Sequence, residues 1–136
     1  MGEGDQAVES SVAFEPPDVV VWTLVGDIGL NMLLELRDEQ ERIAKGWPYV
    51  LVLLDVSRVG SVSPAARTEA TRKRDTTLRG IAYVGASFHL RVLATLLSKA
   101  ASLLNKISED PPRFFATKAE AFAWLEERRR QIHQGK

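Results

Sequence analysis

Small polar and acidic side chains stand where the sequence predicts that strands end and helices begin. Asp27 and Asp55 each follow an apolar run, and Ser87 follows a third. In open α/β sheets ligands bind beyond the carboxyl ends of the strands, where free N–H groups of helix N-termini favour anions. Capping and turn formation explain the same residue types without a ligand. The candidate binding residues at this edge are Asp27, Asp55, Ser57, Ser61, Ser63, Ser87 and His89.

The segment Gly85-Ala86-Ser87-Phe88-His89 has the strand–turn–helix setting of a hydrolase nucleophile elbow. That elbow requires glycine on both sides of the serine so that the backbone can turn sharply, and His89 occupies the second glycine position. A histidine so close in sequence to the serine is badly placed as its general base. We therefore expect no catalytic residues, and a serine hydrolase that uses Ser87 stays only as a remote alternative.

The composition leaves little room for other chemistry. The 136 residues include no cysteine and two histidines, and carboxylates do not cluster, so we expect neither a metal site nor a cofactor. The 18 basic and 18 acidic side chains cancel, whereas a nucleic-acid-binding protein normally has a basic excess. No apolar run approaches the roughly 18 residues that a transmembrane helix needs. We expect a cytoplasmic protein, because a chain without cysteine suits a reducing compartment.

Strands and helices alternate along the chain. Two prolines, Pro16 and Pro17, separate two β-branched runs and predict a hairpin. The helix after it would be capped by Asp27 or Asn31. The order ββαβαβαβα predicts an α/β domain with a mixed, largely parallel sheet flanked by helices. The expected segments are strands 8–14, 18–25, 49–57, 81–84 and 113–115, and helices 30–43, 64–78, 88–107 and from 117 onward. We place a flexible N-terminus at 1–7, the domain at 8–127 and a polar tail at 128–136.

Two of the expected helices have unusual surfaces. The helix at 64–78 is polar and basic, with few apolar residues to anchor it, so it is either a solvated face or a recognition surface. Its candidate contact residues are Arg67, Arg72 and Arg74. The helix at 88–107 has an apolar face that is wider than one sheet surface requires. That excess fits core packing, a homodimer, a protein partner or an apolar ligand.

The segment YVLVLLDVSRVGSVSPAAR resembles the central strand and following helix of the STAS superfamily, which has the anti-sigma-factor-antagonist fold. In that family a hydrophobic strand ends in Asp-x-Ser and leads into a helix start of the Asp-Ser-Ser-Gly type. IAYVG at Ile81–Gly85 and the ending RFFATKAEAFAWLEE extend the resemblance to the SpoIIAA-like branch, which is related to STAS and CRAL-TRIO proteins. The resemblance covers about Val12 to Glu127 and implies the fold and a habit of binding partners.

The sequence departs from that family at the residue on which its regulation depends. Counting from Asp55, Ala65 stands where the family has its phosphoacceptor serine, and alanine has no hydroxyl to carry a phosphate. The resemblance therefore does not imply phospho-regulation at Ala65. We predict a non-catalytic binding or regulatory module that uses the carboxyl edge of the sheet and the helix at 64–78 to bind a protein partner or small ligand. The alternative is a carrier of an apolar ligand, such as a lipid, in a cleft beside the helix at 88–107.

Overall fold

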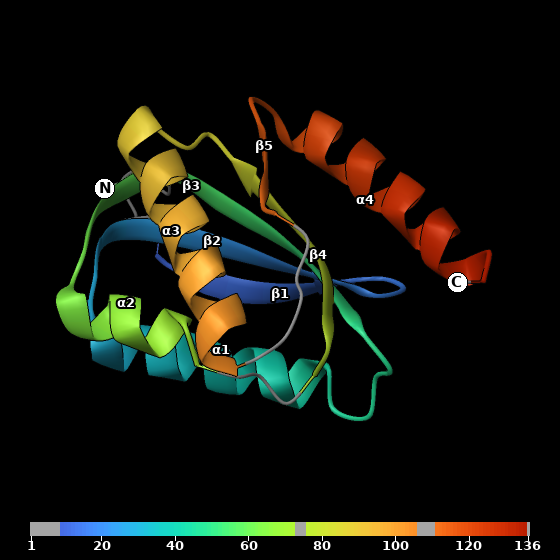
Figure 1. Ribbon diagram of the computed structural model, residues 1–136, viewed down its shortest axis with the longest axis horizontal. Coiled ribbons are helices and arrows are strands. Elements are labelled where there is room, and N and C mark those ends of the chain that lie inside the picture. Colours follow the sequence, from blue (N-terminus) through green and yellow to red (C-terminus); the bar gives the residue numbers. More distant parts are fainter. Residues whose placement is uncertain (1–8, 73–75, 106–110, 136) are drawn as a thin grey trace, which may run out of the picture.

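The computed structural model describes residues 9–72, 76–105 and 111–135. The elements follow the predicted order ββαβαβαβα, and the mixed α/β class is confirmed (Figure 1). They are β1 (Ser11–Glu15), β2 (Val19–Ile28), α1 (Leu30–Ile43), β3 (Val50–Val62), α2 (Pro64–Ala70), β4 (Leu78–Val84), α3 (Phe88–Asn105), β5 (Arg113–Phe115) and α4 (Lys118–His133).

The strands form a 5-stranded sheet in the order β1-β2-β3-β4-β5. β1 pairs antiparallel with β2 through the predicted hairpin, and the other neighbouring strands pair in parallel. Each pair of parallel strands is connected by a crossover that contains one helix, which is the usual connection between parallel strands. The carboxyl ends of β2, β3, β4 and β5 therefore share one edge of the sheet.

The central strand β3 is buried on both faces, as its continuous apolar run predicts. Val50 and Val52 belong to a core that includes Trp22 of β2 and Leu36 of α1. Leu51 and Leu53 point to the opposite face, where they pack with Ala121 and Leu125 of α4. Alternation along one strand thus builds two cores, with α1, α2 and α3 on one side of the sheet and α4 on the other.

Helix α4 lies close to its face of the sheet because small residues let it approach. A Cβ atom at Gly80 would come within 3.1 Å of Leu51 Cδ2 and 3.3 Å of Arg128 Cγ. Gly80 therefore lies inside β4, where it makes room for α4. Ala82 and Ala121 are fully buried in the same contact.

Several predicted boundaries were wrong. Helix α2 stops at Ala70 and does not reach Leu78, which enters β4 opposite Val50. β3 continues to Val62 because β2 remains paired with it as far as Ile28. The N-cap of α1 is Gly29, without a side-chain cap, so neither Asp27 nor Asn31 has the expected capping role. The proposed flexible terminus at 1–7 and the end of the predicted helix at 106–107 lie outside the described residues.

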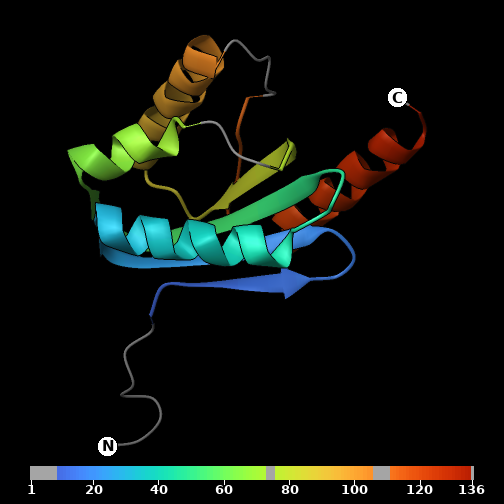
Figure 2. The ribbon, with the colours of Figure 1, turned by 90° about the horizontal axis from the view of Figure 1, so that it is seen from below.

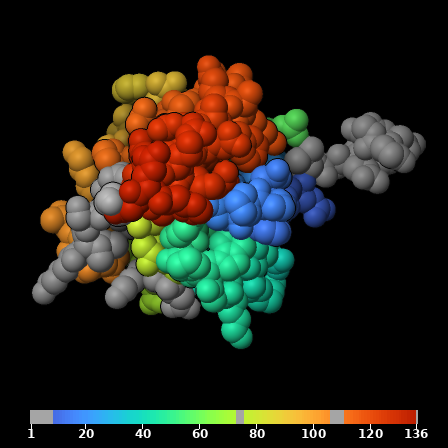
Figure 3. Space-filling model, turned by 90° about the vertical axis from the view of Figure 1, so that its right-hand side faces the viewer, coloured from blue at the N-terminus to red at the C-terminus, as the bar shows by residue number. Residues whose placement is uncertain are grey.

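Helix α4 runs to His133, past the predicted end of the domain at Glu127, because its last turns are anchored to the sheet. Arg129 donates to both carboxylate oxygens of Asp18, with the shortest contact at 2.7 Å. The Tyr49 hydroxyl donates to Asp18 and lies 3.1 Å from His133 Nε2. Figure 3 shows this side of the molecule, with α4 beside the β1–β2 turn and the end of α1.

Asp18 is ionised in this setting. Burial opposes its charge, but hydrogen bonds from Arg129 and Tyr49 and the positive charge of Arg129 outweigh burial, and they hold the pKa of the Asp18 carboxyl below its usual range. The same contact acts on Tyr49 in the opposite direction. Burial, together with the neighbouring Asp18 carboxylate, raises the pKa of Tyr49 to about 12.

We expect Asp18→Asn to lower the free energy of unfolding at pH 7 by about 1–3 kcal/mol, because it removes the charge that Arg129 binds. Since the pKa of Asp18 is lower in the folded state, the stabilisation is complete above about pH 5 and is lost as the pH falls through the folded-state pKa. Urea unfolding of wild type and variant between pH 7 and pH 3 measures this difference. Asp38→Asn, at an exposed position of α1, is the matched control. A stability difference that stays constant down to pH 3 would contradict this assignment.

Candidate ligand-binding cavity

The predicted edge residues form two separate hydrogen-bonded pairs. Asp27 accepts a hydrogen bond of 3.0 Å from the Ser61 hydroxyl, and both side chains are exposed. Asp55 accepts from the Ser57 hydroxyl at 2.7 Å and from the Ser57 backbone N–H at 3.1 Å, and its other oxygen lies 3.7 Å from Lys118 Nζ. Burial opposes ionisation of Asp55, but the Ser57 bonds and Lys118 hold its pKa below the usual range. Both carboxylates therefore already have partners within the protein.

The other edge serines cap helices. Ser63 accepts from the Ala66 N–H at the start of α2, with Pro64 in the first turn, which confirms the predicted helix start. The Ser87 hydroxyl accepts from the Leu90 N–H at 3.2 Å, which confirms the predicted cap of α3. His89 is exposed on the first turn of α3. The edge therefore contains capped helix ends and local pairs, and no single cluster of side chains gathers there in the described part of the chain.

The basic residues of the α2 region lie at the surface. Arg67 is exposed and its Nε donates to the Val62 carbonyl. Arg72 follows the helix and lies 3.5 Å from Glu69, with most of its side chain exposed. Arg74 lies outside the described residues. The exposed basic surface predicted from the sequence is thus present at Arg67 and Arg72.

Helix α3 crosses one face of the sheet but stands away from it (Figures 1 and 2). Its first turn is held by the Ser87 cap and by Leu90, which packs against the core. Its last residue, Asn105, donates to the Thr71 carbonyl at 2.9 Å, just beyond α2. The backbone of α3 approaches α2 more closely than it approaches the strands, whereas α4 lies close to β3, β4 and β5. Between its two anchored ends, α3 leaves space above the sheet.

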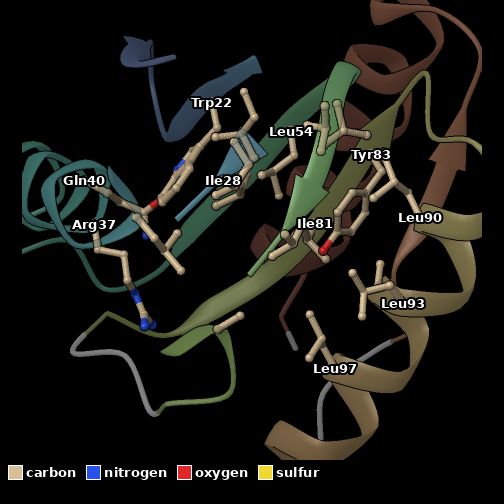
Figure 4. Close-up of a pocket in the computed structure, with 18 of the residues that line it drawn as sticks. Trp22, Ile28, Arg37, Gln40, Leu54, Ile81, Tyr83, Leu90, Leu93 and Leu97 are labelled. Atoms are coloured by element: carbon tan, nitrogen blue, oxygen red, sulfur yellow. The ribbon is translucent and has the colours of Figure 1, made fainter. Parts of the chain in front are cut away.

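That space is an apolar cavity of about 150 Å³. The sheet contributes side chains of β2, β3 and β4 to its floor, and α1 and α2 contribute one wall. Leu90, Leu93, Ala94 and Leu97 of α3 form the opposite wall (Figure 4). The remaining apolar lining consists of Leu24, Ile28, Leu33, Val52, Leu54, Val56, Val59, Val62, Ala70, Leu78 and Ile81.

A few polar side chains interrupt this apolar lining. Trp22 Nε1 donates a hydrogen bond of 2.6 Å to Gln40 Oε1. Arg37 also lines the cavity, and its guanidinium is held by the Glu69 carboxylate at 2.8 Å and by the Glu69 carbonyl. Tyr83 of β4 extends its ring into the same space (Figure 4). Apolar walls with a few fixed polar groups are the usual composition of small-molecule sites.

The outer side of α3 is also apolar. Phe88 is 81% exposed, Leu96 59% and Leu103 79%, and Val92 lies between the first two at helical spacing. This outer stripe is where the sequence placed a dimer or partner contact. The excess of apolar surface predicted for this helix is therefore divided between the cavity and the solvent.

Sequence reasoning missed the polar part of the cavity. Gln40 gives a signal in retrospect, because it takes an inward position in the series Leu33, Leu36, Gln40 and Ile43, where an apolar residue is expected. Trp22 and Tyr83 give none, since both fit ordinary strand patterns. The candidate edge residues Asp27, Asp55, Ser57, Ser61, Ser63, Ser87 and His89 are not part of the lining.

The described residues contain neither a metal-binding group nor a membrane-spanning helix. No group of three His, Asp or Glu side chains is arranged to bind a metal ion. Within the same residue ranges, no helix has the length and hydropathy to cross a lipid bilayer.

The structure is similar to two solved structures. One is an uncharacterised protein of the DUF3478 family with a SpoIIAA-like fold from Shewanella loihica PV-4, at 16% identity and a TM-score of 0.63, covering 86% of this chain and 92% of that one. The other is the anti-sigma factor antagonist SpoIIAA in its unphosphorylated form, at 12% identity and a TM-score of 0.57, covering 87% and 98%. No protein-family model and no curated protein matches the sequence. The chain has a SpoIIAA-like fold, which confirms at the level of the fold the resemblance that its sequence indicates.

Proposed function

We propose that this protein is a non-catalytic module that binds an apolar small molecule in the cavity beneath α3. The observation that carries the proposal is the cavity itself, because a concave apolar space with a few fixed polar groups is the usual form of a small-molecule site. Its walls come from β2, β3, β4, α1, α2 and α3, so it lies over the three central strands on one face of the sheet. This is the alternative function indicated by the apolar excess of the helix at 88–107.

The size of the cavity limits the ligand. An apolar cavity of about 150 Å³ engineered in another protein binds benzene. The cavity beneath α3 has the same volume and similar Leu, Ile and Val walls. It accommodates one aromatic ring or a short alkyl segment, so a longer lipid would have to extend beyond it.

Catalysis is not part of the proposal. The Ser87 hydroxyl accepts the Leu90 N–H as a helix cap, and the neighbouring His89 lies on the exposed first turn of α3. An activated serine needs a general base within hydrogen-bond reach, and the described contacts of Ser87 include none. Asp55 accepts its hydrogen bond from Ser57 and Asp27 accepts from Ser61, and neither carboxylate is bonded to Ser87 or His89 in the described contacts.

A protein partner at α2 is the second candidate function. The solved structures with the same fold include an anti-sigma factor antagonist, a name that describes action on another protein. In this chain Ala65 is exposed at the start of α2, beside the exposed Arg67. An exposed basic helix end with little apolar anchoring suits recognition of an acidic protein surface. Phosphorylation at Ala65 has no part in this candidate, because alanine has no hydroxyl.

The cavity proposal is tested with isopropylbenzene and a pair of neighbouring substitutions. At about ten times its Kd, the probe should raise the free energy of unfolding of the wild type by about 1.4 kcal/mol. Leu97→Trp should abolish this stabilisation, because the indole fills the space that Leu97 lines. Leu96→Trp places the same side chain on the outer stripe and should leave the stabilisation intact.

Thermal unfolding with and without the probe, and saturation-transfer NMR of the probe, measure both effects. Native mass spectrometry of the purified wild type adds a search for a co-purified ligand. The proposal fails if isopropylbenzene does not stabilise the wild type, or if both tryptophan variants lose the effect equally.

We expect Ser87→Ala to lower the free energy of unfolding by about 0.5–2 kcal/mol, because it removes a helix cap. Hydrolysis of a p-nitrophenyl ester should stay at the buffer rate for both wild type and variant. Chemical denaturation and an absorbance assay measure the two quantities. Ester turnover by the wild type that disappears in the variant would overturn the non-catalytic proposal.

The partner candidate is tested by changing Arg67, Arg72 and Arg74 together to alanine. The melting temperature should hardly change, because Arg67 and Arg72 are exposed and substitutions at exposed positions typically alter stability by about half a kcal/mol or less. Capture of an acidic partner from native lysate should weaken, and wild-type capture should fall with added salt, since exposed charges are screened over about 10 Å at 0.1 M. Equal recovery by both proteins at low and high salt would show that α2 is only a solvated surface.

A further inference from the structure

Gln40 is a buried amide in the wall of an apolar cavity. Its side chain belongs to α1 and the residue is only 5% exposed. A buried amide is costly unless its donors and acceptor find partners. The stability of Gln40 at this position therefore depends on what each of its polar atoms contacts.

The orientation of the Gln40 carboxamide is fixed by Trp22. An indole N–H is a donor only, so the atom 2.6 Å from Trp22 Nε1 must be the carbonyl oxygen, Oε1. The amide nitrogen, Nε2, then occupies the other branch of the carboxamide. Figure 4 shows the Gln40 oxygen beside the Trp22 indole nitrogen. Trp22 thus determines which end of Gln40 is available to another molecule.

The Nε2 donors of Gln40 have no acceptor among the described residues. Every fully enclosed side-chain nitrogen or oxygen in that part of the chain has a hydrogen-bond partner. Nε2 must therefore touch open space, and the cavity is the open space that Gln40 lines. A buried, oriented N–H donor that faces an apolar cavity is a binding element for a hydrogen-bond acceptor.

The charge around Gln40 limits the kind of acceptor. Arg37, one turn earlier on α1, is the cation of the lining, but Glu69 pairs with it at 2.8 Å and neutralises it. Its remaining contacts are the carbonyls of Glu69 and Arg72. A carboxylate ligand would lie in an apolar space beside an ion pair that is already complete, so its own charge would be unpaired. A neutral carbonyl avoids that cost.

We propose that the cavity beneath α3 binds a compact, neutral carbonyl compound, a ketone or ester, whose oxygen accepts a hydrogen bond from Gln40 Nε2 and whose apolar part fills the Leu- and Val-lined space. This rests on the proposed function and adds the chemical class of the ligand. Trp22 is a positioning residue, because it orients Gln40 and does not supply the hydrogen bond itself.

The test compares acetophenone with isopropylbenzene, which have the same number and connectivity of non-hydrogen atoms but differ in that a carbonyl oxygen replaces one methyl group. The protein variants are Trp22→Phe and Trp22→Phe/Gln40→Met, which differ only at Gln40. The single variant removes the indole donor, so that no unpaired Trp22 N–H can substitute for Gln40. The double variant replaces both polar partners by apolar groups, a change that is often nearly neutral for stability.

Loss of Gln40 should weaken acetophenone binding by about 3- to 10-fold relative to isopropylbenzene, which is the range expected for one neutral hydrogen bond. Dissociation constants from ligand-detected NMR titrations give this ratio. In the ¹⁵N-labelled wild type, the Gln40 side-chain NH₂ resonances should move with acetophenone and much less with isopropylbenzene. Gln131→Glu, on the exposed part of α4, should leave both constants unchanged.

The results distinguish failure of the carbonyl assignment from failure of the cavity proposal. If both probes bind but the ratio does not depend on Gln40 and its NH₂ resonances respond equally, the carbonyl assignment is wrong and the cavity proposal stands. If isopropylbenzene binds and acetophenone does not, the carbonyl assignment is again wrong. If neither probe binds the wild type, the cavity proposal fails and the assignment of Gln40 fails with it.

Discussion

Burial of β3 on both faces governs the architecture of this protein, because a strand that is apolar on both sides must be covered twice. Leu51 and Leu53 require a helix on one face, and Val50 and Val52 require cover on the other. The right-handed crossovers β2–α1–β3, β3–α2–β4 and β4–α3–β5 all step in one direction along the sheet, so their helices cover one face, and α4, which follows β5, covers the other. The difference between these two covers determines where a ligand can bind.

On one face the cover is close. Gly80 and Ala82 of β4 have little or no side chain, so Arg128 and Trp124 of α4 approach Gly80 and Ala121 is buried in the same core as Ala82. Asp18, Tyr49 and Arg129 then fasten the far end of α4 to the beginnings of β2 and β3. A face that is packed and fastened in this way stabilises the domain.

The sequence predicted the order of elements, the class of the sheet, the central position of β3 and the serine caps of α2 and α3, because these depend on local patterns and on capping chemistry. It missed the length of α2, since the end of that helix is set by the pairing of Leu78 with Val50 on a distant strand. It also missed the cavity site. Gln40 and Trp22 are far apart in sequence, and their contact depends on how α1 lies on β2. No local pattern encodes such a contact.

The placement of polar atoms separates the two candidate regions. At the carboxyl edge, Asp27 and Asp55 are hydrogen-bonded to Ser61 and Ser57, and Ser63 and Ser87 cap helices, so each of these side chains has a partner within the protein. In the cavity, Gln40 has one partner that orients it and a second polar atom directed toward open space. Buried polar groups are retained against a cost, whereas exposed serines and aspartates at turns carry almost none. The placement of Gln40 is therefore the physical observation behind our proposal of a site under α3, whereas the edge of the sheet, where the sequence first directs attention, has no comparable buried polar group among the described residues.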